Sequence, residues 1–310
     1  MMTNRQIIAA IDGSIYSSNA LDYLIRLFGG QSDIAIHLLS IVSSAGSDRN
    51  WMLDVDPLRG QSSAMKRRVR MAEKYLHDAR ARLLRNGFAE EQITIRVDVS
   101  TASVATAIHH DANRGKYDSL LIGRRGMGKV GEMFFGSVSA YLVKQCHEVP
   151  LWVIDGEVSS SRFLLAVNST PESLLAADHL GYMMQGSSDV EICLYHSIPI
   201  FGGRTATREE DFIRQWGREW CEENLDIENY LFHAHARILM DNGIERRRIS
   251  QLPMRRDLDA SRDLLRQARK HDCGTIVIGR RGRDIAKGFL GGVSDRTMQQ
   301  AQNMAIWLVG

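Results

Sequence analysis

Hydrophobic residues occur in short runs that alternate with longer amphipathic stretches along the whole chain. In the first half, five apolar runs predict strands, and stretches with helical spacing separate them. Continuous apolar strands separated by helices indicate a parallel sheet covered on both faces. The expected strands are 7–11, 34–42, 93–99, 119–122 and 150–154, and the expected helices are 16–28, 61–86, 101–114 and 137–147.

The helix expected at 61–86 has the clearest periodicity. Its apolar residues lie alternately four and three positions apart, which places them on one face of a helix. Gly87 follows as the expected C-cap. The apolar positions are Met65, Val69, Ala72, Leu76, Ala79 and Leu83.

The second half repeats the order of strands and helices found in the first. Its second helix is expected to be longer, roughly 209–242, while residues 43–62 and 198–210 match no pattern. A linker of small and polar residues, Gly156–Ser161, separates the halves. The expected strands of this half lie near 162–167, 190–196, 247–252, 275–278 and 304–309.

Matching landmarks indicate that the two halves are copies of one domain. Gly123 and Gly279 lie 156 positions apart, and Trp152 and Trp307 lie 155 positions apart. A nearly constant offset of this size indicates domain duplication, because solenoid repeats are much shorter. We therefore expect domains at 1–156 and 160–310. Their closing apolar strands would be exposed edges in isolation, so we expect them to pair within an intramolecular pseudo-dimer.

Composition narrows the class of protein. The chain has 310 residues, 44% of them hydrophobic and 25% charged, with a net charge of +2. These values are typical of a globular protein of two domains, and they give no support to a nucleic-acid or membrane partner. No apolar run approaches the ~20 residues that span a bilayer. Four scattered cysteines suggest buried free thiols, so we expect a cytoplasmic protein.

A glycine-punctuated loop occurs once in each half, between an expected strand and an expected helix. Backbone N–H groups at such a junction can bind an anion, and the helix amino terminus adds positive potential. The loop therefore predicts phosphate binding. It has no GxxxxGK[ST] sequence, and its single GxGxxG match at 126–131 follows the fourth strand, which argues against the P-loop and the dinucleotide fold.

The spacing of the first loop is G-x2-G-x9-G-S, from Gly123 to Ser137. This resembles the nucleotide loop of the universal stress protein family, and the resemblance covers the whole chain as two consecutive family domains. It implies two tandem open parallel sheets of five strands with helices on both faces, similar to adenine nucleotide alpha hydrolases. It also implies that ATP, with Mg²⁺, binds beside the carboxyl ends of the strands.

Carried over by position, the resemblance assigns the first half a complete nucleotide site. Asp12 would lie beside the ribose or its metal, and the backbone at Ile41 would recognise adenine. Asp12 and Ser137 could instead only cap helices, and Arg124 could be an exposed loop arginine. The side chains of Ile41 and Ile122 are expected in the core. The full expected set is Ala10, Asp12, Ile41, Ile122, Gly123, Arg124, Gly126, Gly136, Ser137, Val138 and Ser139.

The second half departs from this pattern. Asn168 replaces Asp12, and only eight residues separate Gly282 from Gly291. Gly292 replaces Ser137, although Val293 and Ser294 again match Val138 and Ser139. We therefore expect weak nucleotide binding or none in this half. The corresponding positions are Asn168, Gly279, Gly282, Gly291, Gly292 and Ser294.

No Ser/His/Asp set, metal-ligand spacing or catalytic base is evident near the loops. A nucleotide-binding regulator of a stress response is therefore the favoured function. A nucleotide-independent scaffold for protein partners and a slow ATPase remain alternatives. Neither the protein partner nor a homodimer can be derived from the sequence.

Overall fold

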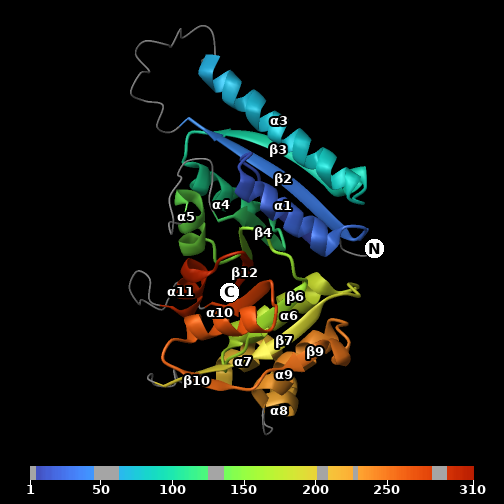
Figure 1. Cartoon of the computed structure of the whole chain (residues 1–310), viewed down its shortest axis with the longest axis vertical. Helices are drawn as coiled ribbons and strands as arrows, with labels where there is room; N and C mark the ends of the chain where they lie inside the picture. The colour runs from blue at the N-terminus through green and yellow to red at the C-terminus, as the bar shows by residue number, and fades with distance from the viewer. Residues whose placement is uncertain (1–4, 45–62, 125–135, 201–208, 226–229, 281–291) are drawn as a thin grey trace. The chain divides into compact units, whose positions relative to one another are not determined.

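The computed structural model describes residues 5–44, 63–124, 136–200, 209–225, 230–280 and 292–310. The chain divides into two compact units, Met1–Glu157 and Val158–Gly310 (Figure 1). Within the described parts, no helix is long and apolar enough to cross a membrane. The predicted pairing of the two closing strands concerns contacts between the units and stays a prediction.

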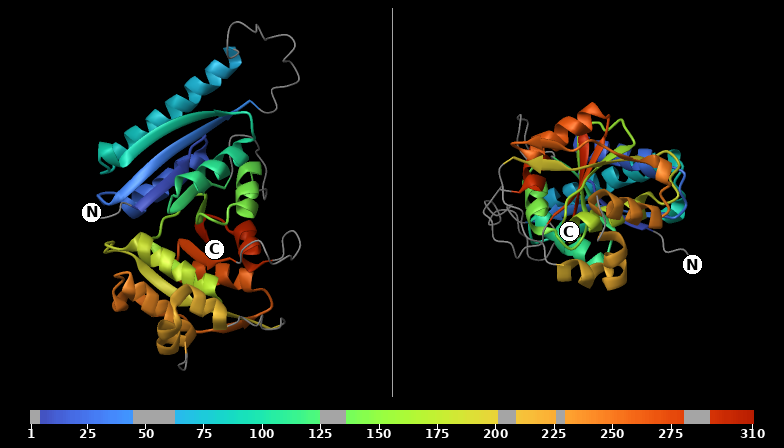
Figure 2. Two further views of the ribbon diagram at one scale, coloured as in Figure 1. Left: turned by 180° about the vertical axis from the view of Figure 1, so that it is seen from behind. Right: turned by 90° about the horizontal axis from the view of Figure 1, so that it is seen from below.

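The first unit contains a parallel sheet in the order β3-β2-β1-β4-β5. The order reverses between β1 and β4, so right-handed connections place α1 and α3 on one face and α4 and α5 on the other (Figures 1 and 2). A short 3₁₀ turn, Glu90–Gln92, precedes β3. The elements are β1 (Arg5–Ala10), α1 (Ile15–Phe28), β2 (Ile34–Ser43), α3 (Ser63–Arg85), β3 (Ile93–Ser100), α4 (Val104–Gly115), β4 (Ser119–Gly123), α5 (Ser137–Gln145) and β5 (Leu151–Asp155).

Helix α3 buries only part of the face that its periodicity predicts. Ala72, Leu76, Ala79 and Leu83 are buried, whereas Met65 and Val69, nearer the amino end, are half-buried. The helix runs along β2 and β3 (Figure 1). Its carboxyl-terminal two-thirds therefore carry the contact with the sheet.

The second unit repeats the first, with a parallel sheet in the order β12-β11-β6-β7-β9. In both units a buried tryptophan on the closing strand packs against a phenylalanine: Trp152 on Phe28 and Trp307 on Phe163. The expected α/β class with five-stranded parallel sheets is thus confirmed. The elements are β6 (Arg162–Ala166), α6 (Pro171–Met184), β7 (Glu191–Tyr195), α9 (Tyr230–Asp241), β9 (Ile249–Gln251), α10 (Ala260–Lys270), β11 (Thr275–Gly279), α11 (Val293–Gln300) and β12 (Met304–Val309).

The prediction of a single long helix at 209–242 is wrong. The chain forms α7 (Glu209–Trp216), α8 (Arg218–Leu225) and α9 instead. Gly217 separates the first two because its φ of +83° is incompatible with a continuous right-handed helix. Apolar spacing survives such a break, so periodicity alone did not reveal it.

The second unit also contains a small parallel sheet that was not expected. Strand β8 (Ser197–Pro199) pairs with β10 (Arg255–Asp257) just beyond the ends of β7 and β9. The strand predicted at 247–252 is correspondingly short, since Arg246–Arg248 form a 3₁₀ turn and β9 begins at Ile249.

Candidate functional site

The positions predicted for the first site meet at one edge of the first sheet. Ala10 ends β1, Ile41 lies near the end of β2, Ile122 and Gly123 end β4, and Ser137 begins α5. This edge includes the point between β1 and β4 where the strand order reverses. Open α/β sheets bind ligands at such points. Gly126 lies outside the described residues.

Asp12 shapes the turn between β1 and α1. Its Oδ1 accepts hydrogen bonds from the Ser14 backbone N–H at 2.9 Å and from the Ser14 hydroxyl at 2.6 Å. Ser14, not Asp12, is the N-cap of α1, and its Oγ accepts from the Ser17 N–H at 3.2 Å. Asp12 therefore holds the capping residue in place, and its partly exposed carboxylate lies at the end of β1.

Tyr75 is a site residue that the sequence did not reveal. Gly13 has a φ of +79°, and a Cβ built on it would lie 2.5 Å from the Tyr75 ring. The half-buried ring thus packs on the turn that carries Asp12. Tyr75 projects from α3, which is more than sixty residues away in sequence, so no local pattern connects it to this turn.

The end of β4 lies very close to the start of α1. A Cβ on Gly123 would lie 2.7 Å from the Tyr16 backbone carbon and 2.8 Å from its oxygen. Glycine is needed here because of helix packing, whether or not a ligand approaches. Ile122 is buried as expected, whereas Ile41 is only half-buried, so the expected core position of Ile41 is wrong.

Arg124 is not the exposed loop arginine that one alternative described. It is 2% exposed, and its Nη1 lies 3.4 Å from Oδ2 of Asp155 at the end of β5. Its backbone N–H donates to the Ile154 carbonyl at 2.9 Å. The guanidinium group is therefore held at the neighbouring strand.

The carbonyl of Arg124 joins the two ends of the glycine loop. It accepts a hydrogen bond from the Gly136 N–H at 3.2 Å and another from the Ser139 hydroxyl at 2.5 Å. The same hydroxyl lies 3.0 Å from the Gly136 carbonyl, and Ser139 is buried. Ser139 thus closes the loop instead of presenting its hydroxyl proton to a ligand.

The amino terminus of α5 faces solvent at this edge. Gly136 is the N-cap, so the alternative that Ser137 caps the helix is wrong; Ser137 is the first helical residue and is exposed. First-turn N–H groups have no partner within their own helix. Those of Ser137, Val138 and Ser139 can therefore bind an anion with the support of the helix dipole.

The second unit preserves the backbone of this arrangement but changes its side chains. The Ile11 N–H donates to Leu39, and the Val167 N–H donates to Tyr195 in the same way. Gly292 is the N-cap of α11, as Gly136 is of α5. The C-caps Cys146 and Ala301 lie 155 positions apart, so Gly292 lies opposite Ser137 as expected, and α11 begins one residue later, at Val293. Gly282 and Gly291 lie outside the described residues.

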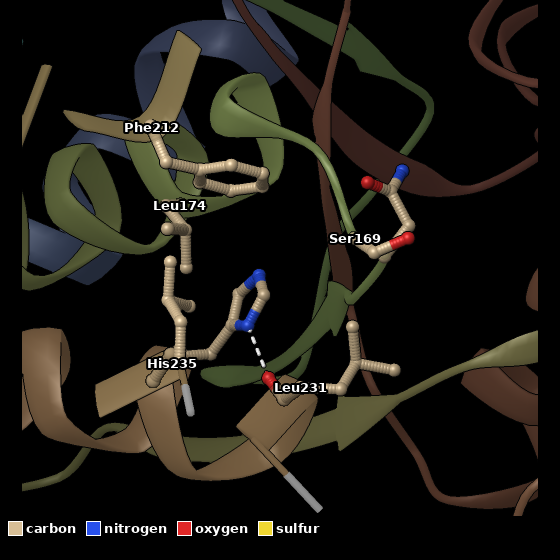
Figure 3. A pocket seen from close by; sticks show the side chains of 8 residues that line it. Ser169, Leu174, Phe212, Leu231 and His235 are labelled. Atoms are coloured by element: carbon tan, nitrogen blue, oxygen red, sulfur yellow. Dashed lines mark hydrogen bonds between the residues drawn. The ribbon is translucent and has the colours of Figure 1, made fainter. Parts of the chain in front are cut away.

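Apolar side chains fill the region beside Asn168. The hollow that remains has no room for a water-sized molecule (Figure 3), whereas typical ligand pockets measure roughly 300–1,000 Å³. Phe212 of α7 and Leu231 of α9 project into it from helices that the second unit places over this edge. The lining residues are Asn168, Ser169, Leu174, Phe212, Leu225, Leu231, Ala234 and His235.

A buried serine–histidine contact next to this hollow is structural. Ser173 Oγ and His235 Nε2 are 2.7 Å apart. The other ring nitrogen of His235 lies 2.5 Å from the Leu231 carbonyl oxygen (Figure 3). Burial lowers the pKa of His235 to about 4, so the ring is neutral at pH 7. Ser173 is fully buried, so a substrate cannot reach its hydroxyl. In the described ranges, no group of three or more potential ligands could hold a metal ion.

Comparisons with known proteins agree with this fold. The chain resembles the crystal structure of a universal stress protein from Archaeoglobus fulgidus, with a TM-score of 0.63 and 16% identity over 98% of this chain and 95% of that one. It also resembles a protein of unknown function from Pseudomonas aeruginosa, with a TM-score of 0.58 and 13% identity over 99% and 93%. At these identities the likeness shows a shared fold and no more.

No curated protein matches the chain. A family model described as "Universal stress protein family" matches residues 3–155. This stretch contains Asp12, Gly123, Gly136 and Ser137, the positions on which the resemblance rested. Through residues 3–155, the chain belongs to the universal stress protein family.

Proposed function

We propose that the first unit binds one adenine nucleotide, ATP with Mg²⁺, and acts as a nucleotide-dependent regulator in the cytoplasm. The observation that carries this proposal is the exposed amino terminus of α5 at the edge where the strand order reverses. First-turn N–H groups and the helix dipole favour a phosphate group at that position. The Arg124 carbonyl supports the site by joining the loop ends.

The residues at this edge fit such a ligand. Ser137 and Val138 would contact phosphate, and the Ile41 backbone, on a half-buried strand end, would be accessible to adenine. Asp12 would lie beside the ribose or the metal ion. Arg124 and Ser139 would shape the loop without contacting the ligand, because both side chains are engaged within the protein.

We propose that the second unit does not bind nucleotide. Asn168 carries no charge, Val293 offers no hydroxyl at the helix start, and Phe212 and Leu231 line a hollow too small for a nucleotide. In this proposal the second unit is retained for pairing between the domains.

Nucleotide content measured on the full chain tests the proposal. The denatured protein should release close to one equivalent of adenine nucleotide, and a Mg-ATP titration should saturate at one site per chain. Asp12→Asn should weaken binding by about tenfold, the loss of one charge-assisted interaction. Asp22→Asn, on α1 where it pairs with Arg82 of α3, is the matched control. Two equivalents per chain would contradict the asymmetry, and none would favour the nucleotide-independent scaffold.

Replacing Ser137 or Ser139 with alanine should weaken nucleotide binding, for a different reason at each position. Each alanine substitution removes a hydrogen bond of about 0.5–1.5 kcal/mol, which corresponds to a loss of affinity of roughly two- to tenfold. Only Ser139→Ala should also speed hydrogen exchange at the Gly136 N–H in the free protein, because Ser139 closes the loop. Equal exchange in both variants would show that the Ser139 hydroxyl does not hold the loop.

A further inference from the structure

The duplicated fold brings side chains at the same two positions together in each unit. These positions lie away from the carboxyl-terminal edge of the sheet, where the candidate nucleotide site lies. In the first unit the pair is His37 on β2 and Tyr117, which lies just before β4. In the second unit, Cys193 on β7 and Cys273, just before β11, occupy the same positions. The sheet register confirms the match, since His37 faces Ile8 and Thr94, and Cys193 faces Leu164 and Ser250.

In the first unit the two side chains contact each other. The rings of His37 and Tyr117 have centroids 5.0 Å apart, and His37 Nδ1 lies 2.7 Å from Thr94 Oγ1. The fold therefore directs these two positions toward one another whatever residues occupy them.

In the second unit two thiols take the place of the rings. Cys193 and Cys273 hydrogen-bond to each other through their side chains. The Ser250 hydroxyl donates to Cys193 Sγ at 3.4 Å, as Thr94 contacts His37 in the first unit. Both cysteines are free thiols. The pair is thus a dithiol whose side chains face each other.

The surroundings make the two thiols unequal. Hydrogen bonds from the Cys273 thiol and Ser250, with the positive charge of Arg162, lower the pKa of Cys193 to about 6 against the effect of burial. The hydrogen bond to Cys193 and burial raise the pKa of Cys273. Arg162 is held beside the pair by Glu191 and by the His271 carbonyl, 3.2 Å from its Nη1. Cys193 is therefore the thiolate, and thiolates are the nucleophilic form.

The pair lies just beneath the surface at the amino-terminal edge of the sheet. Cys193 is 5% exposed and Cys273 is 3% exposed, but Asp272 is exposed and Arg162 is 41% exposed at its side chain. Asn168 marks the opposite, carboxyl-terminal edge. A small oxidant could reach the sulfur atoms without passing the nucleotide edge.

We propose that Cys193 and Cys273 form a reversible disulfide when the protein meets hydrogen peroxide. The Cys193 thiolate attacks the peroxide, so that an S–O bond forms, the O–O bond breaks, and the released hydroxide takes a proton from solvent. Cys273 then attacks Cys193 Sγ, so that the S–S bond forms and the hydroxyl leaves as water with the Cys273 proton. Two thiols are oxidised and one peroxide is reduced to two waters. An added thiol reverses the change by exchange.

Peptide mapping of the folded full chain after treatment with hydrogen peroxide tests this. A peptide pair linked through Cys193 and Cys273 should appear with the loss of two hydrogens, and dithiothreitol should restore both thiols. A Cys146→Ala/Cys221→Ala variant should give the same linked pair, because these two cysteines lie elsewhere. Cys273→Ala should instead leave a sulfenic acid on Cys193 that a 1,3-dione reagent traps.

Three results would overturn the proposal. One is folded protein that loses both thiols without forming the linked pair. Another is a linked pair that forms only after denaturation. The third is Cys193→Ala protein in which Cys273 oxidises as fast as it does in the wild type. Circular dichroism of each variant establishes that the comparison is made on folded protein, and the wild-type mapping decides the outcome without any variant.

Discussion

Replacing Gly279 with alanine should destabilise the second unit by about 3 kcal/mol or more, at the upper end of overpacking effects. A Cβ at this position would lie 2.2 Å from the Glu172 carbonyl oxygen and 2.7 Å from the Ser173 nitrogen. Both are backbone atoms at the start of α6, so no side-chain rotation relieves the overlap. The helix would have to move away from β11, and its buried face would separate from the sheet. Hydrogen exchange measured by mass spectrometry should show faster opening of α6 and β11.

Gly292→Ser is the matched control for this prediction. Among the described residues, the nearest neighbours of a Cβ on Gly292 lie at 3.5 and 3.6 Å, and Gly292 is the N-cap of α11 at a φ of −80°. Serine is a favourable N-cap residue, so the change should be neutral or stabilising by a few tenths of a kcal/mol. A Gly279→Ala variant as stable as Gly292→Ser would show that α6 does not approach β11 as closely as the structure has it.

Acid should unfold the second unit at a pH where the first unit is still folded. His179 and His235 are both buried, and burial lowers their pKa values to about 3 and about 4. Above pH 6.5, these histidines are neutral in the folded and unfolded states, so they do not change stability. Below pH 6.5 the unfolded chain binds protons that the folded chain cannot, so stability falls until the pH reaches the folded values.

The expected size of this effect is large for a single domain. At pH 5 each histidine should lower the free energy of unfolding by about 2 kcal/mol. This follows from 1.36 kcal/mol for each unit by which the pH lies below the pKa of the unfolded chain. Urea unfolding at pH 7 and pH 5, followed by hydrogen exchange in α6 and α9, measures the loss. His179→Gln or His235→Gln should each reduce the pH dependence by about half, even where the variant is less stable at pH 7.

The exposed His233 of α9 provides the matched control, because His233→Gln removes an imidazole from the same unit without changing a buried one. If stability at pH 5 equals that at pH 7, the two buried histidines accept protons in the folded state. The hydrogen-bonded arrangement around Ser173 would then have to change on protonation.

Much of the architecture follows from local patterns in the sequence. Apolar runs and helical periodicity predict both five-stranded sheets, and the offset of 156 positions between Gly123 and Gly279 matches the repeated register. The charge lost at Asn168 was equally visible. These features depend either on residues close together in the chain or on a comparison of the two halves. Both kinds of information can be read directly from the sequence.

Other features depend on side chains that are distant in sequence and meet only in the folded protein. Arg124 pairs with Asp155, Tyr75 covers Gly13, and Phe212 reaches the edge beside Asn168. Gly217 divides a helix that periodicity had predicted as continuous.

The sequence by itself determined the two-domain α/β plan, the family of the first half, and the positions at the strand ends. Only the tertiary structure decided that Ser139 closes the loop, that Arg124 is buried, and that Cys193 and Cys273 contact each other. The physical reason is that periodicity reports which face of an element is apolar, whereas contacts between elements depend on how the chain folds back on itself.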